Sequence, residues 1–127
     1  MTGVDISATM KLYFASMDSA DFDTAKELFA ADAVYLRSPL GGTPDNPFAT
    51  SGVAPVVGRP AIEEFFAKRG KKPTHHDIQR EAVADDDWWA EGEAWVGEGA
   101  AATEKRPFLV HATFNGDGLI QRFLAIR

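Results

Sequence analysis

Cysteine is absent from this chain of 127 residues, and basic residues are few. Without cysteine the protein has neither a disulfide framework nor a thiolate nucleophile. Lys and Arg number 13 against 19 Asp and Glu, which leaves a formal net charge of −6. An acidic chain of this kind presents no positive field to a phosphate backbone, so a nucleic acid is not expected as its partner.

Long hydrophobic runs are also missing. No segment approaches the ~20 apolar residues that cross a bilayer, and the first residues show no basic stretch followed by an apolar run. We therefore expect no membrane association and a cytoplasmic location. The chain has no internal repeat, and 127 residues at 45% hydrophobic fit a single domain, residues 1–127, with one core.

Three helices are predicted in the first 70 residues. Behind the candidate caps Asp5 and Ser7, apolar side chains recur at helical spacing, which predicts an amphipathic helix that ends near Asp18. A second, shorter helix is predicted behind Asp21 or Asp23, with Phe22, Ala25, Leu28 and Phe29 on one stripe. The third runs from Pro60, suited to a first turn, to Gly70, suited to a C-terminal cap.

Strand-like segments dominate the remainder of the chain. The predicted strands are residues 33–37, 76–83, 88–96, 106–114 and 119–126. The sequence Asn-Gly-Asp-Gly at 115–118 predicts a hairpin between the last two strands. Residues 39–58 contain four prolines and four glycines, which predicts a long loop and a candidate lid.

Three stretches carry a family resemblance: YFASMDSADFDTAKELFAADAVYLRSP (13–39), GRPAIEEFFAKR (58–69) and FNGDGLIQRF (114–123). Together they resemble the nuclear transport factor 2-like superfamily, in its SnoaL-like and steroid isomerase-like branch. The resemblance implies an α+β fold, in which a cone-shaped, curved, mostly antiparallel sheet wraps around three helices as a cystatin-like roll. Because that superfamily hosts isomerases, cyclases, dehydratases and proteins with no chemistry, it does not imply one reaction.

The resemblance can be followed residue by residue for the steroid isomerase site. Those enzymes use an aspartate base together with an oxyanion hole made of a tyrosine and a protonated aspartic acid. Tyr13 matches the tyrosine. At the position of the base the chain has Arg37 and Ser38 before Pro39, and at the position of the second acid it has Val110, which cannot donate a hydrogen bond. Steroid isomerase chemistry itself is therefore not expected.

A pair of carboxylates on the strand 88–96 offers an alternative. Trp89, Glu91, Glu93 and Trp95 share one face of that strand because side chains alternate. The alignment with the family favours this face in the pocket, near Arg37, where the carboxylates would form a buried acid–base group. In the other reading Glu91 and Glu93 lie on a solvated or dimer-facing side, and the small residues pack under the helices.

Other candidate catalytic residues have two readings each. Tyr13 is either an oxyanion donor or a packed ring with one hydroxyl partner, and Arg37 either clamps an anion or pairs with a glutamate. His75 and His76 point to opposite faces of one strand, so joint metal ligation is not expected, whereas His76 can enter the pocket as a base. His111, next to Val110, is expected to face away from the cone. Neither a metal nor a cofactor is expected.

The function that follows is binding of a small apolar or aromatic molecule in the cone, with proton-transfer chemistry of the isomerase, cyclase or dehydratase type. The alternative is a non-catalytic ligand-binding or dimeric assembly module of the same fold. A homodimer is expected in either case. The residues expected to line the ligand are Phe14, Tyr35, Phe66, Trp89, Trp95, Phe108, Val110 and Phe123.

Overall fold

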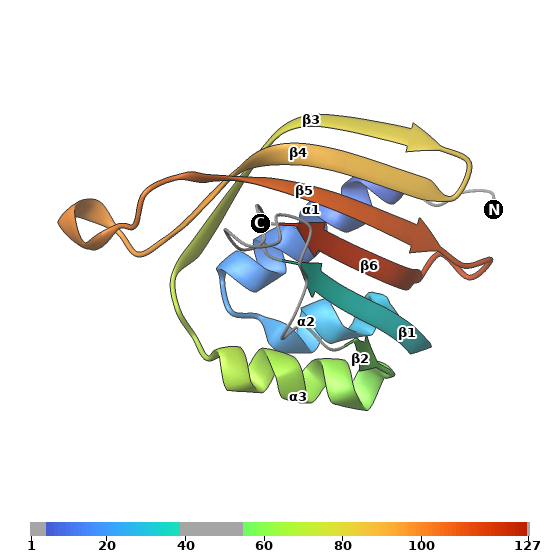
Figure 1. Ribbon diagram of the computed structural model, residues 1–127. Helices are drawn as coiled ribbons and strands as arrows, with labels where there is room; N and C mark the ends of the chain where they lie inside the picture. The colour runs from blue at the N-terminus through green and yellow to red at the C-terminus, as the bar shows by residue number, and fades with distance from the viewer. Residues whose placement is uncertain (1–4, 39–54, 127) are drawn as a thin grey trace, which may run out of the picture.

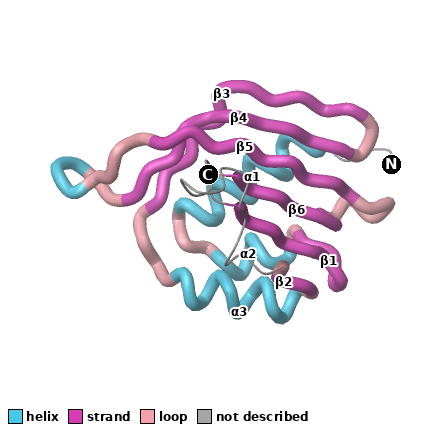
Figure 2. Tube along the Cα trace, viewed as in Figure 1, coloured by secondary structure: helices cyan, strands magenta, loops and turns pink. Residues whose placement is uncertain are grey.

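Helices and strands form two layers in the computed structural model, which describes residues 5–38 and 55–126. Figure 1 shows the α-helices on one side of a curved sheet, and Figure 2 traces the same arrangement by element type. The helices are α1 (Ile6–Asp18), α2 (Phe22–Glu27), α3 (Arg59–Arg69) and the short 3-10 helix η1 (Gly99–Ala101). The strands are β1 (Phe29–Ser38), β2 (Val56–Val57), β3 (Thr74–Ala84), β4 (Asp87–Val96), β5 (Arg106–Phe114) and β6 (Ile120–Ile126).

The sheet has six strands in the order β2-β1-β6-β5-β4-β3. Only β1 and β6 run parallel, and the other neighbours are antiparallel. Because the last strand inserts between β1 and β5, the first and last strands of the chain lie side by side within the sheet (Figure 1). The predicted α+β fold, with three helices on a curved and mostly antiparallel sheet, is confirmed.

The predicted helix ends agree with the structure because their signals are local. The Asp5 carboxylate accepts a hydrogen bond from the Ala8 backbone N–H at 3.0 Å and caps α1, which ends at Asp18. Pro60 lies in the first turn of α3, and Gly70 follows its end with φ +76°, in the region that favours glycine.

Two predictions about the segment between α2 and α3 need correction. Phe29 was predicted on the stripe of the second helix, but α2 ends at Glu27 and Phe29 begins β1, where it pairs with Ile120 of β6. The predicted loop 39–58 contains β2, which pairs with β1 at Val34 and Tyr35. In both places pairing with a distant strand overrides the local pattern. Residues 39–54, the body of the candidate lid, lie outside the described residues.

The core between the layers is built largely from aromatic rings. Tyr13 of α1 contacts Phe29, Phe66 and Phe123 at centroid distances of 5.6, 6.4 and 5.0 Å. Tyr35 stacks on Phe123 at 4.9 Å with an interplanar angle of 6°. Each such pair adds about 0.5–1.5 kcal/mol to the burial of its surface. The cone is therefore filled in large part by its own side chains.

One carboxylate joins the N-terminal turn of α1 to the far edge of the sheet. Glu81 of β3 accepts hydrogen bonds from Ser7 Oγ and, at 3.1 Å, from Trp88 Nε1, and it lies 3.1 Å from Lys11 Nζ. The hydrogen bond from Ser7, followed by that from Trp88, lowers the pKa of Glu81 below its usual value. The ionised form of Glu81 therefore contributes to the stability of the folded state.

Glu81→Gln is expected to lower the free energy of unfolding at pH 7 by roughly 1 kcal/mol. Because the folded-state pKa is lowered, this contribution is present above the unfolded-state pKa and is lost as pH falls through the folded-state value. Urea unfolding between pH 7 and pH 3 measures it, with the exposed Glu98→Gln as the control. A difference between wild type and Glu81→Gln that does not shrink at low pH would contradict the assignment.

Candidate functional site

An inner cavity lies between α1, α3 and the sheet. Its volume is only ≈ 30 Å³, about that of one water molecule in the liquid. Its lining residues are Tyr13, Phe14, Met17, Tyr35, Arg37, Phe65, Arg69 and His76. The predicted catalytic residues Tyr13, Arg37 and His76 are thus brought together at one place.

A larger mouth cavity of ≈ 240 Å³ shares Arg37 and His76 with the inner cavity. It extends from these two residues along the ends of β4 and β5. The lining residues are Arg37, Thr74, His76, Ala94, Trp95, Val96, Thr103, Glu104, Arg106, Pro107 and Phe108. A molecule bound in the mouth cavity would therefore contact His76 at its inner end.

The buried His76 pairs with the partly exposed Asp18. The distance from His76 Nδ1 to Asp18 Oδ1 is 2.6 Å, and only 3% of the histidine side chain is exposed. Asp18 Oδ2 also accepts the backbone N–H of His76 at 3.0 Å. An ionised carboxylate can only accept, so the Nδ1 proton belongs to His76 and the lone pair of the neutral ring lies on Nε2. The pair holds the imidazole in the tautomer that a general base requires.

Two further side chains orient the carboxylate. Thr74 Oγ1 donates to Asp18 Oδ1 at 2.9 Å, and Arg69 donates to the same Thr74 oxygen at 2.7 Å. Since the Arg69 guanidinium occupies an acceptor position on Thr74, the hydroxyl proton is directed to Asp18. These residues come from three separate elements: the end of α1, the end of α3 and the first residues of β3. The hydrogen-bonded chain Arg69–Thr74–Asp18–His76 fixes the position of the His76 imidazole.

Asp18, Thr74 and Arg69 were missed as site residues by sequence reasoning. For Asp18 a signal existed, because it is the last residue of α1 and no basic residue lies in the last turn. A carboxylate at a helix C-terminus is disfavoured by the helix dipole. A residue that breaks a local rule in this way is a candidate for a functional role. Thr74 and Arg69 carried no such signal.

The predicted face of β4 is wrong. Trp88 and Ala90 are buried under the helices, whereas Trp89, Glu91 and Glu93 point to the outer face of the sheet. Glu91 pairs there with Arg80 at 3.3 Å, so it does not approach Arg37 as predicted.

Glu93 and Trp95 lie on the same outer side. Glu93 accepts a hydrogen bond from Gln79 at 2.9 Å. Trp95 stacks on His75 at a centroid distance of 5.0 Å, although its ring also borders the mouth cavity. The alternative reading, with the small residues packed under the helices, is the one that the structure has. The basis for a buried carboxylate pair inside the cone is therefore removed.

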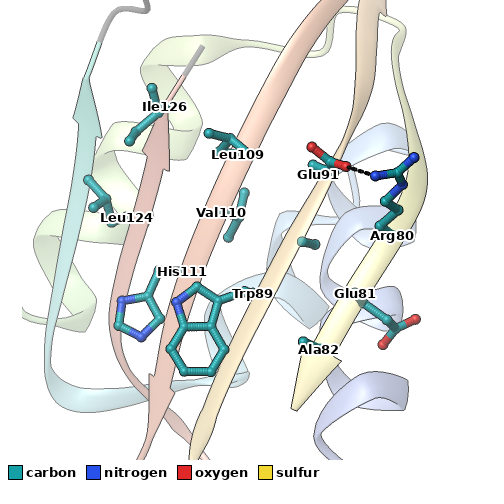
Figure 3. Close-up of a pocket in the computed structure, with 11 residues that line it drawn as sticks. Arg80, Glu81, Ala82, Trp89, Glu91, Leu109, Val110, His111, Leu124 and Ile126 are labelled. Carbon is teal, nitrogen blue, oxygen red and sulfur yellow. Dashed lines mark ion pairs between the residues drawn. The ribbon is translucent and has the colours of Figure 1, made fainter. Parts of the chain in front are cut away.

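The outer face carries an apolar groove of ≈ 390 Å³, drawn in Figure 3. Trp89 and Leu109 in this groove are 41% and 45% exposed. His111 faces outward, as predicted, and stacks on Trp89 at 5.0 Å with an angle of 8°. Its Nε2 lies 2.9 Å from Asp87 Oδ1, and hydrogen bonds from Thr113, followed by His111, lower the pKa of Asp87. We call this surface the outer groove.

The remaining residues predicted to contact a ligand divide into two groups. Phe14 and Tyr35 line the inner cavity, and Phe108 lines the mouth cavity. Phe66, Phe123 and Val110 are buried in the core and line neither of these cavities. The opposite orientation of His75 and His76, predicted from strand alternation, is confirmed.

Residues 5–38 and 55–126 contain no group of three or more His, Cys, Asp or Glu side chains able to hold a metal ion. Within the same ranges no helix is long and apolar enough to cross a membrane.

A known domain family matches most of the chain. The model of the SnoaL-like domain matches residues 10–123. The chain belongs to the SnoaL-like domain family. The resemblance predicted from the sequence is thereby confirmed for nearly the whole chain. No curated protein has a matching sequence.

Solved structures similar to this SnoaL-like protein show the same fold. A cystatin fold protein from Novosphingobium aromaticivorans has a TM-score of 0.72 at 17% identity, over 98% of this chain and 100% of that chain. A protein with a ketosteroid isomerase-like fold from Catenulispora acidiphila has a TM-score of 0.71 at 18% identity, over 92% of this chain and 82% of that chain. An LEH-like epoxide hydrolase of Mycobacterium tuberculosis has a TM-score of 0.71 at 13% identity, over 95% of this chain and 80% of that chain. At such identities the likeness concerns the fold alone.

Proposed function

We propose that this SnoaL-like protein binds a small apolar or aromatic molecule and catalyses proton transfer on it, with His76 as the general base. The observation that carries the proposal is the 2.6 Å pair between His76 and Asp18 at the inner end of the mouth cavity. In its neutral form, a buried histidine whose tautomer is set by a carboxylate is suited to accept a proton.

The proposed reaction has two steps. His76 Nε2 first takes a proton from a carbon of the substrate, which leaves an electron pair on the substrate and an imidazolium paired with the Asp18 carboxylate. The imidazolium then returns the proton, either to another carbon, which is isomerisation, or to a departing hydroxyl, which is dehydration. Tyr13 and Arg37 line the adjoining inner cavity, and both side chains can stabilise a developing oxyanion.

The test uses a substrate whose reaction needs only a base. Removal of one C–H proton from 5-nitrobenzisoxazole opens its ring and produces a coloured phenolate. We expect the wild-type protein to accelerate this reaction with saturation kinetics, because the mouth cavity gives the base a binding site. A rate no greater than that of free imidazole at equal concentration would contradict the proposal.

A second proposed property is assembly into a homodimer through the outer groove. Exposed apolar patches of this kind mark interaction surfaces, and the groove exposes Trp89 and Leu109 beside the outward His111. In the alternative to catalysis, this assembly would be the main role of the protein.

Leu109→Lys is expected to raise the dissociation constant of such a dimer about tenfold or more, because it places a charge in an apolar interface. Light scattering across a concentration series measures the mass against the 13.8 kDa of one chain. Leu12→Lys is a matched control, since Leu12 is 47% exposed on α1. A monomer in the wild-type protein at all concentrations would exclude this dimer.

A further inference from the structure

The mouth cavity carries positive charge in an otherwise acidic chain. Arg37 comes from β1 and Arg106 from β5, and both line this cavity. Within residues 5–38 and 55–126, neither guanidinium forms an ion pair with a carboxylate. Glu104 supplies the one carboxylate among the lining residues of the cavity.

Two other arginines of the chain form ion pairs with glutamates. Arg59 lies 3.9 Å from Glu27, and Arg80 lies 3.3 Å from Glu91. Arg69, on the inner cavity, donates to Thr74 of the chain of hydrogen bonds behind His76. Arg122 also forms no ion pair within residues 5–38 and 55–126, so what distinguishes Arg37 and Arg106 is that both line one cavity. Their positions therefore favour an anion in the cavity.

We infer that the substrate is a small carboxylic acid, bound with its carboxylate at Arg37 and Arg106 and its reacting carbon at His76. This inference rests on the proposed function of the same site. The planar guanidinium offers two parallel N–H donors that match a carboxylate in geometry as well as charge. In this arrangement the substrate carboxylate binds without reacting, and it positions the C–H bond at the base.

The walls and the volume define the rest of the molecule. Ala94, Trp95 and Phe108 add apolar surface to the lining of the same cavity, which suits a ring. A volume of ≈ 240 Å³ is smaller than the ~300 Å³ at which sites for drug-sized ligands begin. One ring with a short carboxylate arm is of a size suited to this volume.

The experiment is a fluorine NMR titration at pH 7 with 4-fluorophenylacetate and its neutral analogue 4-fluorophenylacetamide. We expect the acid to bind the wild-type protein at least about tenfold more tightly than the amide, because only the acid gains charge-assisted hydrogen bonds. Arg37→Met is expected to weaken binding of the acid by about 10- to 100-fold and to leave the amide unchanged. Arg106→Met is likewise expected to weaken binding of the acid and to leave binding of the amide unchanged.

Arg80→Met is the matched control, because Arg80 is an exposed arginine that lines the outer groove instead of the mouth cavity. Equal binding of acid and amide overturns the inference, and so does a loss in Arg80→Met as large as in Arg37→Met. Binding does not depend on turnover, so the two proposals fail separately. If the acid binds through Arg37 but ring opening of 5-nitrobenzisoxazole does not need His76, only the proposed function is rejected.

Discussion

His76→Gln is expected to lower kcat/KM for ring opening of 5-nitrobenzisoxazole by about 10²- to 10⁴-fold, the usual contribution of a positioned base. Glutamine keeps a polar side chain of similar length but has no nitrogen lone pair able to take a proton. The rate is measured from phenolate absorbance over a range of substrate concentrations. Thermal unfolding of the same samples separates a loss of the base from a loss of the fold.

The adjacent histidine provides the control for this substitution. His75 lies on the outer side of β3, where it stacks on Trp95, so His75→Gln is expected to retain the wild-type rate. The rate of Asp18→Asn is expected to lie between the rates of His76→Gln and His75→Gln, because the base remains but its tautomer is no longer held by a carboxylate. A wild-type rate in His76→Gln, or an equal loss in His75→Gln, would reject His76 as the base.

Gly92→Ala is expected to lower the free energy of unfolding by about 3 kcal/mol, at the upper end for overpacking, because the added methyl meets backbone. An ideal Cβ on Gly92 would lie 1.9 Å from the carbonyl oxygen of Asp77 and 2.9 Å from its carbon. Backbone on the neighbouring strand cannot rotate away as a side chain can. The register between β3 and β4 shifts at the same place, between Ile78 and Arg80, as in a β-bulge.

Gly116→Ala is the matched control for Gly92→Ala. A Cβ added at Gly116 meets no atom within 4 Å, so this variant is expected to unfold within about 0.5 kcal/mol of wild type. Urea unfolding of both variants measures the difference. If Gly92→Ala is as stable as Gly116→Ala, the close approach of β3 and β4 does not exist in solution.

Sequence reasoning predicted most element boundaries because their signals are local. The cap Asp5, the glycine Gly70 and the hairpin turn at 115–118 each act on a few neighbouring residues, and β5 was predicted at its observed bounds, 106–114. The inward direction of Tyr13 and the outward direction of His111 followed from the periods of helix and strand.

The failure at β4 has a physical cause. Trp88 and Trp89 are consecutive, so the alternation offers a tryptophan to either face of the sheet, and a shift of one residue exchanges the two. Burial decided the outcome, because Trp88, Ala90 and Gly92 fit beneath the helices while Glu91 reaches solvent and Arg80. The apolar surface left over on the other face is the outer groove.

By itself, the sequence determined an α+β SnoaL-like domain with Tyr13, Arg37 and His76 as candidates, because periodicity, caps and family motifs are written in short stretches. Only the tertiary structure decided which groups form a site. Asp18 and His76 are 58 positions apart, and no local pattern relates them. They meet because α1 packs against β3 and ends beside its first residues. There the Asp18 carboxylate, which is unfavourable at the end of the helix, accepts a hydrogen bond from His76.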